Sequence, residues 1–160
     1  MAYKVLNNVS VKDASGISSL STDMLVLVIN KNTKNDSSFK ELDEKSKKFI
    51  SKTIRTHLDQ SNSSILLPKI DGINAKSILL VKGLDADMHT HKWLSLFKGI
   101  AQKGNQNKCK DISIMPGTTS PKGKDELWLI EMVSKTIESN VYIFSETKNK
   151  TSKKPSLKKL

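Results

Sequence analysis

Residues 24–29 form an unbroken apolar run, Met-Leu-Val-Leu-Val-Ile, between Asp23 and Asn30. A strand with one wet face alternates apolar and polar residues, whereas a strand covered on both faces reads as a continuous apolar run. The run is far too short to cross a bilayer, since a membrane-spanning helix needs about 20 apolar residues. This segment therefore predicts a buried strand inside a layered α/β domain.

Further strands are expected in segments that are short, apolar or alternating. These segments are Tyr3–Val11, Ser64–Leu67, Ser77–Val81, Asp111–Met115 and Val141–Phe144, the last being either a strand or the end of a helix. The link between the second and third contains Asp71-Gly72, a turn-forming pair, so these two strands are predicted to form a hairpin. A hairpin inside an otherwise alternating order of strands and helices implies a mixed sheet.

Three segments carry apolar residues at three- and four-residue steps, which predicts amphipathic helices. The first is one long helix capped at Ser37 or Ser38, with an inward face of Phe39, Leu42, Phe49, Ile50, Ile54 and Leu58. The second is Thr90–Gly104, with Trp93, Leu94, Phe97, Ile100 and Ala101 inward. The third is Lys124–Ser139, with Leu127, Trp128, Ile130, Val133 and Ile137 available to the core.

The net charge of +11 is concentrated at one end of the 160-residue chain. The segment Lys148–Leu160, KNKTSKKPSLKKL, holds six lysines and no carboxylate, which leaves 21 basic against 16 acidic side chains in residues 1–147. Arg55 is the only arginine, and arginine is the usual reader of base edges. The charge predicts loose, salt-sensitive attraction to polyanions rather than specific nucleic-acid recognition.

The same basic segment indicates the domain organisation. It is polar, unpatterned and interrupted by one proline, as segments that join two domains are. Residues 1–147 are accordingly expected to be one α/β domain, and residues 148–160 an interdomain linker or tail. The chain is then expected to be the front part of a larger protein.

Two loops contain residues that suit ligand chemistry. Residues 116–124 follow a strand and precede a helix, as a phosphate loop does, but five residues separate Gly117 from Gly123 and Asp125 stands where a hydroxyl is needed, so a solvated turn is favoured. Residues 85–91 place four potential metal ligands on alternate positions: Asp85, Asp87, His89 and His91. No second cluster completes a metal site, and the position before a helix favours capping and turn roles.

The remaining candidates predict no catalytic constellation. Cys109 lies between Lys108 and Lys110, which would favour a lowered thiol pKa, but no histidine base is placed for it (His57 falls near a helix end), and a structural cysteine is favoured. Trp93 and Trp128 fall on apolar helix faces, where core packing is the expected role. A single cysteine excludes an internal disulfide, and the N-terminus lacks a signal-peptide core. A soluble, cytoplasmic protein with no membrane partner is expected.

The order of segments resembles a known family. The run DMLVLVINKN is followed by ELDEKSKKFISKTI, the pair ILLPKIDGINAKSILLVKGL, and a closing ELWLIEMVSKTIESNVYIFSETKNK that leads into KKPSLKKL. This layout resembles the N-terminal domain of the cytosolic leucyl aminopeptidases and covers nearly the whole chain. The resemblance implies a three-layer α/β/α fold with a mixed sheet, similar to macro domains.

The resemblance also implies a function without a site in this chain. Family members are two-domain, two-metal hexameric enzymes whose zinc or manganese ligands and catalytic residues lie in the C-terminal domain. No catalytic, cofactor-binding or metal-binding residue carries over, so the chain is expected to serve packing on its peptidase domain, assembly into a homo-hexamer and active-site gating. The alternatives are a nucleic-acid-binding module, with weak binding allowed by the lysines, and a macro-like domain that binds a nucleotide such as ADP-ribose.

Overall fold

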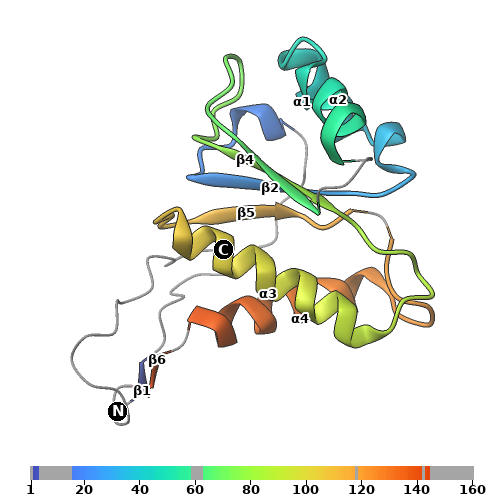
Figure 1. Ribbon diagram of the computed structural model, residues 1–160, viewed down its shortest axis with the longest axis vertical. Helices are drawn as coiled ribbons and strands as arrows, with labels where there is room; N and C mark the ends of the chain where they lie inside the picture. The colour runs from blue at the N-terminus through green and yellow to red at the C-terminus, as the bar shows by residue number, and fades with distance from the viewer. Residues whose placement is uncertain (1, 4–15, 59–62, 118, 142, 145–160) are drawn as a thin grey trace.

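A computed structural model of the protein describes residues 2–3, 16–58, 63–117, 119–141 and 143–144 (Figure 1). The predicted strand at Tyr3–Val11 and the predicted linker at 148–160 therefore lie outside the described residues, apart from Tyr3. The short strands β1 (Ala2–Tyr3) and β6 (Ile143–Phe144) pair antiparallel with each other. In the described ranges, no helix is long and apolar enough to cross a membrane.

The main sheet has four strands in the order β3-β4-β2-β5. Its central strand β2 (Met24–Ile29) runs parallel to β4 (Ile78–Lys82) on one side and to β5 (Ile112–Met115) on the other. The edge strand β3 (Ser64–Leu67) pairs antiparallel with β4, with Leu67 opposite Ile78. The predicted hairpin and the predicted mixed sheet are thus confirmed.

Alternate residues of β2 supply two separate cores. Met24, Val26 and Val28 belong to a buried cluster with side chains of α3 (Thr90–Gln106) and α4 (Glu126–Val141). Leu25 and Leu27 belong to a second buried cluster with α1 (Ser37–Lys45), α2 (Phe49–Thr53) and the π-helical turn η3 (Ile54–Leu58). Figure 1 shows the resulting layers, with α1 and α2 on one face of the sheet and α3 and α4 on the other. The three-layer α/β/α fold is confirmed.

The first helix differs from its prediction. Its N-cap is Asp36, whose carboxylate accepts hydrogen bonds from the amides of Ser38 and Phe39, so the predicted cap at Ser37 or Ser38 was wrong. The prediction of a single long helix was also wrong. The helix is interrupted between α1 and α2, where Lys47 and Lys48 have positive φ. Directly after the break, Ile50 is buried and Phe49 is exposed.

Phe49 and Leu127 were predicted to face the core but are exposed, and Ile130 is only half-buried. Phe49 begins α2 directly after the break and is 47% exposed. Leu127 lies in the first turn of α4 and is 63% exposed, while its neighbour Leu129 is buried against α3 and the sheet. In the second helix, Trp93 and Phe97 are buried as predicted and Leu94 is half-buried.

Candidate functional site

The carboxyl ends of β2, β4 and β5 meet at one edge of the sheet, which is where open α/β folds place their ligands. Asn30 follows β2, Gly83 follows β4, and Gly117 lies two residues after β5. The connections leave this edge toward opposite faces, because β2 continues to α1 while β4 and β5 continue to α3 and α4. This edge is therefore the first place to look for a binding site.

The Asn30 side chain fills the space between the two glycines. A Cβ atom added to Gly83 would lie 1.8 Å from Oδ1 of Asn30, and one added to Gly117 would lie 2.8 Å from Nδ2. The Nδ2 atom is buried and has no hydrogen-bond partner in the described part of the chain. The Asn30 carboxamide therefore fills the space between the backbones that follow β4 and β5.

The loop after β5 has the geometry of a helix-leading turn. The amide of Lys122 donates to the carbonyl of Ala86 at 2.6 Å, which joins this loop to the one after β4. Oδ1 of Asp125 accepts a hydrogen bond from the amide of Trp128 at 2.8 Å, three residues on, as an N-cap does. The residue that spoils the phosphate-loop pattern therefore starts α4.

The segment from Asp85 to His91 is exposed and contains no assembled metal site. Asp85 forms a 4.0 Å ion pair with Lys31, and the rings of His89 and His91 stack with centroids 5.7 Å apart. Among the described residues, no group of three histidine, cysteine, aspartate or glutamate side chains could hold a metal ion. The residues described here thus offer no ligand set that fits a divalent ion.

Cys109 is buried, and burial is the main cause that raises the pKa of its thiol. The negative charges of Asp23 and Asp111 raise the pKa further, and Lys76 lowers it. The suggestion of a lowered thiol pKa is therefore wrong, because burial and the two carboxylates act in the opposite direction. The thiolate that a nucleophile needs is disfavoured, in keeping with a structural cysteine.

The two tryptophans belong mainly to the core between the sheet and its helices. Trp93 is fully buried, and its indole Nε1 has no hydrogen-bond partner among the described residues. Trp128 is half-buried against the same cluster, with Nζ of Lys124 5.9 Å from its ring centroid. The expected packing role is confirmed for Trp93.

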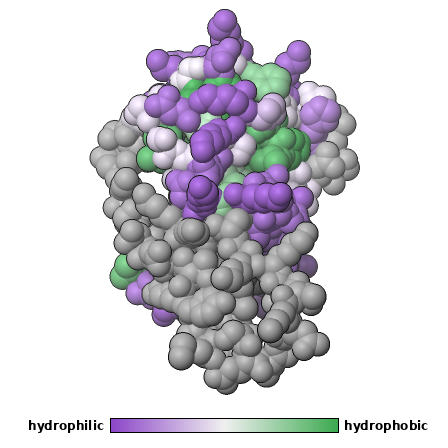
Figure 2. All heavy atoms as spheres, turned by 90° about the vertical axis from the view of Figure 1, so that its left-hand side faces the viewer, coloured by the Kyte–Doolittle hydropathy of each residue, from purple (hydrophilic) through white to green (hydrophobic). Residues whose placement is uncertain are grey.

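A polar cluster at the opposite edge of the sheet was not foreseen. Asp23 precedes β2, and its carboxylate accepts hydrogen bonds from Nζ of Lys76 at 2.7 Å and from the amide of Lys110 at 2.8 Å. Its own amide donates to Oδ1 of Asp111 at 3.3 Å. The hydrogen bond from Lys76 is the main cause that lowers the pKa of Asp23. The cluster joins the amino ends of β2, β4 and β5, on a side of the molecule whose described surface is largely hydrophilic (Figure 2).

Comparison with known proteins places these features in a family context. The model of the cytosol aminopeptidase family, N-terminal domain, matches residues 25–151. A probable cytosol aminopeptidase from Nitrosomonas eutropha is 25% identical over 142 residues, which are 86% of this chain and 29% of that protein.

Two solved structures share the fold. A mutant of tomato leucine aminopeptidase superposes with a TM-score of 0.65 at 15% identity, over 91% of this chain and 30% of that one. A mutant of an Oceanobacillus iheyensis macrodomain gives 0.58 at 13% identity, over 89% of this chain and 78% of that one. The chain spans 29% and 30% of the lengths of the two aminopeptidases.

Proposed function

The chain belongs to the cytosol aminopeptidase family as its N-terminal domain, and from this membership we propose that it is a non-catalytic module of a peptide-cleaving enzyme. The enzyme removes N-terminal residues from peptides in the cytoplasm. The supporting observation is the match over residues 25–151, which runs from β2 to beyond α4. The described residues assemble neither an activated nucleophile nor a ligand set for a divalent ion. In this proposal the peptidase domain supplies the ligands for two divalent ions, zinc or manganese.

The role of the module in this proposal is to pack on its own peptidase domain, support a homo-hexamer and gate the active site. Met88, before α3, is 41% exposed, and Leu127, at the start of α4, is 63% exposed. Both helices begin at the carboxyl edge of the sheet, and the hydrogen bond between Lys122 and Ala86 joins the loops that lead into them. Large apolar side chains at one end of the domain support a contact with another domain there.

A hydrolysis assay tests the non-catalytic part of the proposal. The purified chain is expected to leave leucine p-nitroanilide intact at any added concentration of zinc or manganese. Metal-dependent hydrolysis that co-elutes with the chain and disappears with a chelator would overturn it. The coding sequence provides an independent check, because the proposal expects about three hundred further residues with acidic metal ligands, enough for a second domain.

The packing role is tested in the full-length parent enzyme. Met88→Lys with Leu127→Lys is expected to weaken hexamer assembly or change the ratio of activity on short and long peptides. Leu66→Lys is the control, because Leu66 is 40% exposed but lies on the edge strand β3. Light scattering and peptide kinetics that respond equally to the two changes would contradict this placement.

Weak nucleic-acid binding is a second candidate, favoured by the net charge of +11. Electrostatic binding to phosphates falls steeply as salt rises and shows no sequence preference. A gel-shift titration over salt is expected to show this behaviour. Binding that persists at high salt, or that selects one sequence, would establish a specific nucleic-acid function instead.

A further inference from the structure

The junction between α1 and α2 holds two consecutive lysines in the left-handed region of backbone conformation. Lys47 has φ 54° and Lys48 has φ 61°. Side chains other than glycine rarely adopt this conformation, and neither position is a glycine or an asparagine. Such strain persists only where the surrounding structure enforces it, and it concentrates at functional sites.

The structure enforces this junction through side chains on both sides of it. The carboxylate of Asp43, in α1, accepts hydrogen bonds from the amide of Ser51 at 2.9 Å and from its hydroxyl at 2.6 Å, in α2. The hydroxyl of Ser46 donates to the carbonyl of Asp43 at 2.9 Å, and Ser46 is buried. The junction is therefore a built element of the fold.

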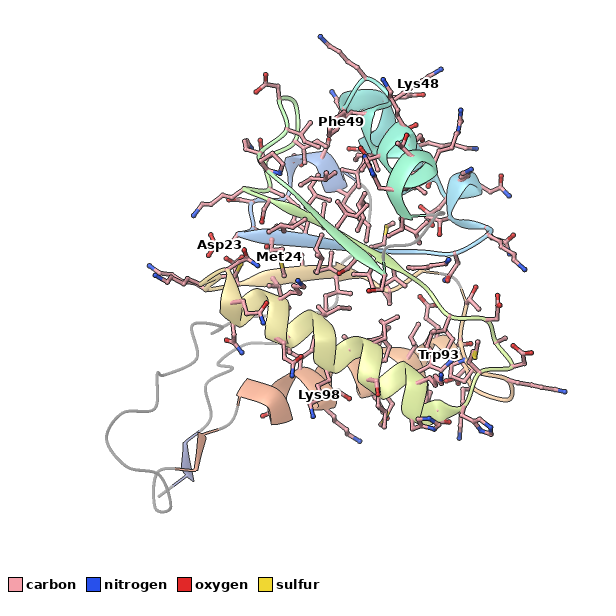
Figure 3. The ribbon with its side chains drawn as sticks, in the orientation of Figure 1. Asp23, Met24, Lys48, Phe49, Trp93 and Lys98 are labelled. Atoms are coloured by element: carbon pink, nitrogen blue, oxygen red, sulfur yellow. The ribbon has the colours of Figure 1, made fainter. Side chains whose placement is uncertain are left out.

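The junction carries exposed lysines on both sides of an exposed aromatic residue along the chain. Phe49 is 47% exposed and is surrounded in sequence by four exposed lysines. We name this surface the basic corner: Lys45, Lys47, Lys48, Lys52 and Phe49. Figure 3 shows Lys48 and Phe49 at the end of the molecule farthest from α3 and α4. The exposed carboxylates on this part of the chain are Glu44, beside Lys45, and Asp71, whose turn lies against the end of α1.

We propose that the basic corner docks an acidic polypeptide segment. An apolar side chain of the segment packs on Phe49, and flanking carboxylates meet the lysines. Lysine is a mobile point charge that suits carboxylates in varied geometry. Single-stranded nucleic acid instead needs a series of aromatic side chains on which successive bases stack, and the corner has one. Charge complementarity suits both ligands, so it is the single aromatic side chain that favours an acidic peptide over an oligonucleotide.

A binding experiment with the 160-residue chain tests this proposal. The probe is a fluorescent hexapeptide in which two glutamates stand on each side of a Leu-Phe pair. Lys47→Glu with Lys48→Glu is expected to weaken binding about tenfold in anisotropy titrations at near-physiological salt. The matched control is Lys98→Glu with Lys103→Glu, which makes the same charge change on exposed positions of α3 and should stay within about twofold.

Two further comparisons separate lost contacts from lost structure. Lys47→Gly with Lys48→Gly suits the positive φ values and so keeps the fold, yet it removes both charges and should also weaken binding. Phe49→Ser should weaken binding while Leu127→Ser, at the other end of the molecule, should not. If both charge-reversal variants weaken binding equally, binding depends on net charge alone and the proposed site is overturned. Tighter capture of a single-stranded oligonucleotide at the corner, or no binding of the peptide by the unaltered chain, would overturn the proposal.

Discussion

The ammonium group of Lys76 donates a hydrogen bond to Oδ1 of Asp23 at 2.7 Å, and this contact fixes the start of β2 against the turn that leads into β4. The Lys76 side chain is 76% exposed, whereas that of Asp23 is only 15% exposed. The amide of Lys110 binds the other carboxylate oxygen, so the same carboxylate also holds the segment before β5. One acid therefore joins the amino ends of three strands.

This arrangement predicts how stability depends on pH. The pKa of Asp23 is lowered, mainly by the hydrogen bond from Lys76, so its contribution is present above the ordinary carboxyl value of about 3.9 and is lost as the pH falls through the folded-state pKa. The pKa of Lys76 is raised by the same hydrogen bond, so its contribution is complete below the ordinary lysine value of about 10.4 and is lost as the pH rises through the raised value. In urea titrations, Asp23→Asn should reduce the loss of stability in acid. Asp71→Asn, in an exposed turn, serves as the control.

Gly83 should be intolerant of any side chain. A Cβ there would lie 1.8 Å from Oδ1 of Asn30 and 3.0 Å from the carbonyl oxygen of Ile29, so Gly83→Ala should destabilise the fold by more than about 2 kcal/mol. Combining it with Asn30→Gly should recover part of that loss in a double-mutant cycle. Gly99→Ala is the control, because nothing lies within 4 Å of a Cβ there and the helix should gain about 1 kcal/mol. Additive effects at positions 30 and 83 would show that the carboxamide does not fill this space.

Replacing the lysines that have positive φ with glycine should stabilise the fold. The conformation costs an L-residue about 1–2 kcal/mol, so Lys48→Gly should raise the free energy of unfolding by roughly that amount, less the entropy that glycine adds to the unfolded chain. Lys40→Gly, inside α1, should lower it by about 1 kcal/mol. Thermal or urea unfolding measures these two opposite changes in the free energy of unfolding. Destabilisation by both changes would contradict the strain at Lys48.

Trp93 should reveal the cost of its unpaired indole. Trp93→Ala removes a fully buried side chain and should cost about 3–5 kcal/mol. Trp93→Phe leaves a smaller cavity and also removes the buried Nε1–H donor, whose desolvation costs about 1–3 kcal/mol, so the two effects partly cancel. Leu127→Ser, at a 63% exposed position, should change stability by less than about 0.5 kcal/mol. A loss with Phe as large as that with Ala would show that the indole N–H has a partner.

The sequence predicted what hydrophobic spacing controls. The run 24–29 is a strand covered on both faces, and the hairpin around Asp71-Gly72 forms as expected. The break before Phe49 could not be read from spacing, because the apolar residues keep a helical period through it and the segment contains neither glycine nor proline. The hydrogen bonds from Ser51 to Asp43 that span the break join residues eight positions apart, which a helical period does not relate.

The clusters at the two ends of the strands were harder to predict than the strands themselves. In the sequence, Asn30 is only the polar residue that ends the apolar run, and its contacts with Gly83 and Gly117 arise only when three distant strands lie side by side. The joining role of Asp23 depends on the same convergence at the opposite edge. Single-sequence patterns describe neighbours along the chain, whereas both clusters consist of neighbours across the sheet.

Because β2 is buried on both faces, a shift in its register with β4 and β5 would not expose apolar side chains to water. A shift by one residue would exchange Met24, Val26 and Val28 with Leu25, Leu27 and Ile29 between two cores that are both apolar. In a strand with one wet face, the same shift would expose the apolar set, and burial alone would forbid it. Here the register must be fixed by the polar residues at the two ends of the run, Asp23 and Asn30. A change at either end should therefore appear as misaligned strands during folding before it appears as lost packing.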